Sequence, residues 1–167
     1  MDMSRLTPSD AVVALRSFER RFRALFADLE EGESPDDLAR RPAADGWSAI
    51  EHVVAAARGI AGCGRALAAV QQSDDPQLDP ADVQPAGQPR PNQPTGPVHE
   101  RLAELGIEAN LVADLGARTD AAAWERTGTL ADGSGRPVTA LHLLRTAVGC
   151  GVTHLRAAET VLTEVRA

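Results

Sequence analysis

Hydrophobic residues along much of this chain recur every three or four positions, which is the spacing of one face of an α-helix. Four stretches have this pattern, and polar residues fill the positions between. They are Thr7–Glu31, Trp47–Ala68, Val98–Arg118 and Val138–Val165. Four amphipathic helices, each with one face to bury, predict an all-α protein built as a four-helix bundle.

The helix starts are marked by residues that cap helices. Thr7 can accept a hydrogen bond from the first turn, and Pro8 suits the first helical position. Ser48 and Glu51 form an S-x-x-E capping box at the start of the second stretch. The segment Ser34–Asp37 has the same kind of cap followed by Pro and predicts one further short turn.

The second and third helices are separated by a proline-rich segment. Residues 73–97 hold seven of the eleven prolines, which excludes a helix or a central strand because proline lacks the N–H donor and restricts the residue before it. We expect a long surface linker here. Residues 119–137, before the last helix, read as irregular with turns. The whole chain, 1–167, is then a single domain.

Small residues along one flank of the second helix allow two interpretations. This flank carries Gly59, Gly62 and Cys63, and glycine inside a helix costs about 1 kcal/mol relative to alanine. The small side chains either let another helix approach closely or form the wall of a cavity.

Composition narrows the possible functions. Only 3% of the residues are aromatic, so leucine, valine and alanine must build the core. The net charge is −7, and the 17 basic residues, all arginine, are scattered, which gives no electrostatic footprint for nucleic acid. The polar N-terminus lacks a secretory signal, and no apolar run approaches the ~20 residues of a membrane span. We therefore expect a cytoplasmic protein that binds neither nucleic acid nor membrane.

Candidate chemistry is confined to a few histidines and cysteines. No phosphate loop, nucleophile elbow, zinc-protease helix or dinucleotide turn is present. Cys150 and His154 stand four residues apart on the last helix, so their side chains are neighbours. They could supply two metal ligands, the imidazole could lower the pKa of the thiol, or both could simply pack. His99 and His142 lie on more polar positions, and we assign them no role.

Two stretches resemble a known family. Gly46–Val53, with its sequence GWSAIEHV, resembles the start of the second helix in the DinB/YfiT-like superfamily, and Thr139–Arg145 with His154–Arg156 is similar to that superfamily's last helix. The resemblance implies a four-helix bundle, often dimeric, in which three histidines hold a divalent metal. Some members are thiol-dependent transferases or isomerases that use mycothiol or bacillithiol.

The resemblance also places the metal ligands, and two of the three are replaced. The ligand of the second helix falls at Ala55, and the histidine pair of the last helix falls at Cys150 and His154. His52 is the nearest substitute, so a rearranged site of His52, Cys150 and His154 would suit zinc or nickel. We therefore expect a metal-free small-ligand binding or interaction module with no assigned catalytic residue. The alternative is a mycothiol-type transferase or isomerase with the rearranged divalent metal site.

Overall fold

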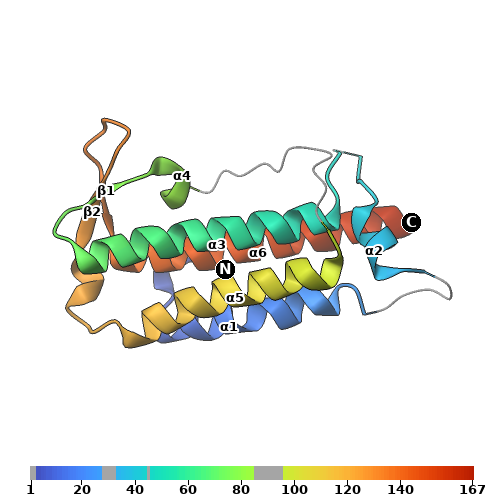
Figure 1. The fold of residues 1–167 in the computed structure, drawn as a ribbon, viewed down its shortest axis with the longest axis horizontal. Coiled ribbons are helices and arrows are strands. Elements are labelled where there is room, and N and C mark those ends of the chain that lie inside the picture. The colour runs from blue at the N-terminus through green and yellow to red at the C-terminus, as the bar shows by residue number, and fades with distance from the viewer. Residues whose placement is uncertain (1–2, 28–32, 45, 85–95) are drawn as a thin grey trace.

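A computed structural model describes residues 3–27, 33–44, 46–84 and 96–167. Four long helices lie side by side and make up most of the molecule (Figure 1). They are α1 (Pro8–Ala24), α3 (Ala49–Gln72), α5 (Val98–Arg118) and α6 (Ala140–Arg166). The structure confirms the predicted four-helix bundle.

The long helices run in two directions. α1 and α6 run one way, and α3 and α5 run the other (Figure 1). The most extensive packing is between the antiparallel pairs, α3 with α6 and α1 with α5. A buried cluster of mainly leucine, valine, alanine and phenylalanine side chains fills the space between all four helices. One wall of this bundle, made by α3 and α6, carries the residues singled out by the sequence.

Short elements complete the fold. A small sheet at one end of the bundle has the strand order β1-β2-β3, with β1 parallel to β2 and β2 antiparallel to β3 (Figure 1). Gly128 of β2 pairs with Val138 of β3. The short elements are η1 (Met3–Arg5), α2 (Pro35–Arg40), β1 (Gln77–Leu78), α4 (Pro80–Val83), η2 (Ala123–Glu125), β2 (Thr127–Leu130) and β3 (Pro137–Thr139).

The structure revises the predicted linker at 73–97. Residues 77–83 form β1 and α4, and the side chains of Leu78 and Val83 are buried in the core. This part of the segment is therefore packed and is not a surface connection. Asp79 caps α4 by accepting a hydrogen bond from the Ala81 N–H, and proline follows the cap at the first helical position. Residues 85–95 lie outside the described residues.

Two helix boundaries also differ from the prediction. The first helix ends at Ala24 and not near Glu31, because the chain tightens there: the Leu25 and Phe26 N–H groups bond to carbonyls three residues back. The last helix begins at Ala140 and not at Val138, because residues 137–139 are paired in β3 and Thr139 caps the helix. Residues 119–137, predicted to be irregular, contain η2, β2 and the first residue of β3.

The small residues of α3 serve close packing. On this flank a Cβ at Gly62 would lie 3.2 Å from the Asp82 Cα on α4. Cys63, the next residue, is also buried. Of the two interpretations of this flank, the structure supports close approach of neighbouring elements.

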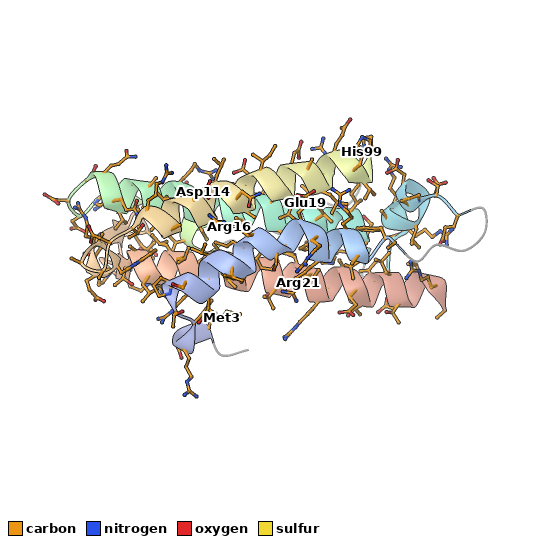
Figure 2. All side chains as sticks on the ribbon, turned by 90° about the horizontal axis from the view of Figure 1, so that it is seen from below. Met3, Arg16, Glu19, Arg21, His99 and Asp114 are labelled. Atoms are coloured by element: carbon orange, nitrogen blue, oxygen red, sulfur yellow. The ribbon has the colours of Figure 1, made fainter. Side chains whose placement is uncertain are left out.

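Polar contacts tie the elements together at the surface. Arg16 of α1 and Asp114 of α5 form an exposed ion pair 2.8 Å long (Figure 2). Arg126, next to β2, donates to the carbonyl oxygens of Val70 and Ser73 at the end of α3. Both contacts join segments that are distant in the sequence, and the second satisfies carbonyls that the helix end leaves without partners.

α3 is long and apolar enough, by length and composition, to cross a membrane. Most of the qualifying span is buried inside the bundle, as expected for a central core helix. We therefore interpret this helix as part of the core.

Candidate functional site

The start of α3 is fixed by a network of short hydrogen bonds. The Ala43 N–H donates to the Trp47 carbonyl at 2.7 Å, which closes the loop that leads into the helix. The Ser48 N–H and hydroxyl both donate to one carboxylate oxygen of Glu51, at 2.8 and 2.7 Å. These bonds hold the first turn in place, so His52 projects from a rigid position and is buried.

His52 meets His154 of α6 at this corner. Their Nδ1 atoms are 3.2 Å apart, so one ring can donate its proton to the other. The ring of Trp47 stacks on His52 with 4.6 Å between ring centroids, and its centroid is 6.5 Å from that of His154. Two of the three predicted site residues are thus brought into contact beside the indole of Trp47.

The electrostatics of this corner keep His154 neutral. Burial, which costs an imidazolium its hydration, and the neighbouring His52 together lower the pKa of His154 to about 4. At pH 7 the ring is therefore an uncharged donor and acceptor. It can donate or accept a hydrogen bond to a polar ligand, but it carries no positive charge.

Cys150 lies one helical turn before His154 and is 8% exposed. Burial raises the pKa of its thiol to about 11, so the thiol stays protonated at neutral pH. Burial also raises the pKa of Cys63 to about 12, and the neighbouring Cys150 adds to the shift. Both cysteines are free. The sequence-based alternative in which His154 activates the thiol by lowering its pKa is wrong for this arrangement.

A groove of about 540 Å³ runs along the outer side of α6 next to this corner. Its α6 residues recur at three- and four-residue spacing, and the turn that precedes α1, which carries Met3 (Figure 2), forms its other lining. The lining residues are Met3, Ser4, His142, Arg145, Thr146, Gly149, Cys150, Thr153 and His154. The groove thus combines an uncharged floor with hydroxyl, imidazole and guanidinium groups.

Arg145 and His142 were not predicted as site residues. The Arg145 Nε–H donates to the Leu6 carbonyl at 2.9 Å, which fixes the guanidinium against the N-terminal turn. Partial burial lowers the pKa of His142, and the positive charges of Arg136 and Arg145 contribute smaller decreases. Helical spacing in the sequence could have grouped them, because both residues share the outer face of the last helix with Gly149 and Thr153.

His99, by contrast, lies at the start of α5, far along the bundle from Met3 (Figure 2). It lines a smaller cavity of about 280 Å³ with apolar residues that include Phe26, which follows α1, and Val98 and Leu102 of α5. It has no place in the groove along α6.

The residues present do not complete the three-ligand metal site that the family resemblance implies. α3 and α6 are antiparallel and His52 faces His154, so Cys150 lies level with about Ala55 or Ala56. Ala55, 7% exposed, has no ligating atom. The described residues contain no group of three or more His, Cys, Asp or Glu side chains placed to hold one ion. His52 and His154 supply two ligands, one fewer than a catalytic zinc site uses.

Comparison with known proteins agrees with this architecture. A solved structure described as "YfiT from Bacillus subtilis is a probable metal-dependent hydrolase with an unusual four-helix bundle topology" is similar over 97% of this chain and 89% of that chain, with a TM-score of 0.73 and 13% sequence identity. At this identity the likeness shows the fold alone. No curated protein matches the chain. The family model of the DinB superfamily matches residues 14–158. This chain belongs to the DinB superfamily.

Proposed function

We propose that this chain is a small-molecule-binding domain that holds its ligand in the groove along α6 without a resident metal. The groove itself is the observation that carries the proposal. Its volume of about 540 Å³ suits a small organic ligand, and it offers a few polar groups around an uncharged floor. Gly149 in the floor leaves room beside α6, since a Cβ there would meet only Met3, at 3.9 Å.

The replaced ligand positions support binding without a metal. Ala55 has no donor atom, and the Cys150 thiol is held protonated by burial. The two remaining imidazoles face each other through their Nδ1 atoms. At the three positions that correspond to the family's metal ligands, Ala55 and Cys150 are buried, and His154 contacts His52.

The proposal can be tested by screening small organic compounds against chelator-treated protein with ¹⁵N-edited NMR. We expect hits to shift the amide signals of Thr146, Gly149 and Thr153. Gly149→Leu should abolish these shifts because its side chain fills the groove, whereas Thr160→Leu, an exposed change further along α6, should not. Hits that map elsewhere, or that survive Gly149→Leu, would count against the groove as the binding site.

A second candidate is a thiol-dependent transferase or isomerase of the mycothiol type with a rearranged divalent metal site. One distance favours it: two nitrogen ligands of a tetrahedral zinc ion lie about 3.3 Å apart, which follows from Zn–N bonds of about 2.0–2.1 Å. The Nδ1 atoms of His52 and His154 are 3.2 Å apart. This candidate needs Cys150 as a third ligand in its thiolate form.

The two candidates differ in what zinc does to Cys150. In the second candidate, zinc binding releases the thiol proton and protects Cys150 from alkylation, and Cys150→Ser weakens zinc binding. In the first, added zinc leaves the rate of Cys150 alkylation unchanged. For both candidates we propose a cytoplasmic location, since free cysteines stay reduced in the cytoplasm.

A further inference from the structure

The end of the groove lined by Arg145 carries positive charge, although the protein is acidic overall. The chain has 24 acidic and 17 basic residues, yet none of the described residues that line the groove is acidic. Arg145 lines it directly, and Arg136 is near enough to lower the pKa of His142. An acidic ligand entering here would meet attraction from the nearest charges, against the sign of the net charge.

The Arg145 side chain is held in place at one of its three nitrogens. Its Nε–H is used in the bond to the Leu6 carbonyl, which removes much of the side chain's freedom. No described residue accepts a hydrogen bond from its two terminal nitrogens. A guanidinium held at Nε directs its two terminal nitrogens, and it is pre-organised for an oxyanion because the planar fork matches two oxygen atoms at once.

The rest of the groove fits an uncharged body. Beyond Arg145 along α6, the lining passes through Thr146 and Gly149 to Cys150. From Arg145 to Thr153 is eight residues of helix, or about 12 Å at ~1.5 Å per residue. His154 lines the far end of the groove, where its imidazole can form a hydrogen bond with the ligand.

We infer that Arg145 anchors the oxyanion of a small organic carboxylate or phosphate monoester, whose apolar body lies along Gly149 and Cys150 toward His154. This inference rests on the proposed function, since it names the class of ligand that the groove takes. The carboxylate and the phosphate share the same chemistry at Arg145, which is a pair of charge-assisted hydrogen bonds.

The test uses three probes with one ring system: naphthoate, naphthyl phosphate and the neutral naphthamide. Each is titrated into ¹⁵N-labelled full-length protein while the Arg145 Nε–H signal and the amides of Thr146, Gly149 and Thr153 are followed. We expect at least one anion to bind roughly tenfold to hundredfold more tightly than the amide, the range expected for hydrogen bonds to a charged group. Its affinity should fall as ionic strength rises, and that of the amide should not.

Variants assign the effect to one side chain. Arg145→Gln should bring the anion's affinity down to that of the amide, and Arg145→Lys should retain part of it. Arg156→Gln removes the same charge from an exposed site on α6 outside the groove. It should change neither the affinity for the anion nor that for the amide. The comparison of anion with amide in the unaltered protein stands even if Arg145→Gln loosens the N-terminal turn.

The outcomes separate the two claims. Equal binding of the amide and both anions in the groove, unchanged by Arg145→Gln, would overturn the inference and leave the proposed function standing. If none of the three probes shifts the groove amides, both claims are wrong. Tighter binding of naphthoate or of naphthyl phosphate identifies which oxyanion the site prefers.

Discussion

Two glycines on α6, only two residues apart, have opposite surroundings. Gly151 faces the core, where a Cβ would lie 2.5 Å from Cζ of the Phe18 ring. Gly149 faces the groove, where a Cβ would meet only Met3 at 3.9 Å. The first glycine is required by packing between α6 and α1. The second leaves space that no described side chain fills.

This comparison extends along the helix. The core face is filled by fully buried side chains such as Leu143, Leu144 and Ala158. The groove face carries Arg145 and Thr153, which are polar. Cys150 and His154 lie at the border between the two, next to α3. α6 therefore builds the bundle with one face and presents chemistry with the other, and each prediction below tests one part of that division.

The largest effect is expected at the border. Ala55→His together with Cys150→His should complete a three-histidine site with His154, since all three positions lie on rigid helices. Nickel or zinc at a hundredfold excess over Kd should then stabilise the folded protein by about 2.7 kcal/mol, and the gain should grow with the logarithm of metal concentration. Calorimetric unfolding of the double variant at several metal concentrations measures this gain.

The single variants are the controls for that experiment, because each leaves an incomplete set of the family's ligands. Without metal the double variant should be less stable than the parent, since it buries added imidazoles. Failure of both ions to bind better than to the parent would show that Ala55 and Cys150 do not face a common point with His154.

On the core face, Gly151→Ala should destabilise the protein. Phe18 is fully buried and cannot move away from the added methyl group, so we expect a loss of about 1–3 kcal/mol, typical of overpacking. Urea unfolding followed by circular dichroism measures it. Stability equal to or above that of the parent would mean that α1 and α6 are less closely packed than described here.

At the border, the pH dependence of folding stability should reveal that His154 is neutral in the folded protein. An unfolded histidine titrates near 6.5, whereas the pKa of His154 in the folded protein is about 4. The folded state therefore binds fewer protons between these values, so stability should be level above about pH 7 and fall as pH drops from 6.5 toward 4. The contribution should be about 1–2 kcal/mol, less than the full shift at ~1.4 kcal/mol per pH unit, because the ring is partly exposed.

The variant His154→Gln should flatten this part of the stability curve relative to the parent. His99→Gln, which removes an exposed imidazole at the start of α5, serves as the matched control. An identical slope in the His154→Gln variant and the parent would mean that the folded protein does not hold His154 neutral.

The smallest effect is expected on the groove face. Gly149→Ala should raise stability by roughly 0.5–1 kcal/mol, because alanine is the better helix former and the site has room for a methyl group. The same urea unfolding experiment applies. A loss comparable to that of Gly151→Ala would show that the groove is closed by packing.

The helices could be predicted from the sequence because their signals are local. Three- and four-residue spacing indicated all four long helices, and Ser48 with Glu51 marked where α3 begins. The strands could not be predicted in this way. β1 is two residues long, and it pairs Leu78 with Leu130, which lies 52 residues further along the chain. Such short strands exist because of a distant partner, which periodicity does not report.

The candidate site, too, could be predicted from the sequence only in part. The family resemblance drew attention to His154 and His52, and the structure brings the two rings together. The use of His52, Cys150 and His154 as metal ligands stays a prediction. Arg145 could not be identified from sequence, because its position depends on the Leu6 carbonyl, 139 residues away. Gly149 and Gly151 are indistinguishable in the sequence, and only the three-dimensional neighbours separate a packing glycine from one beside a groove.

Metal content tests the central claim most directly. The protein is purified without an affinity tag, and zinc, nickel, iron and manganese are measured per chain by elemental analysis. Binding without a resident metal predicts a total well below one ion per chain, unchanged after growth with added zinc or nickel. A content close to one zinc or nickel per chain would contradict this account and make His52, Cys150 and His154 the ligands to test by substitution.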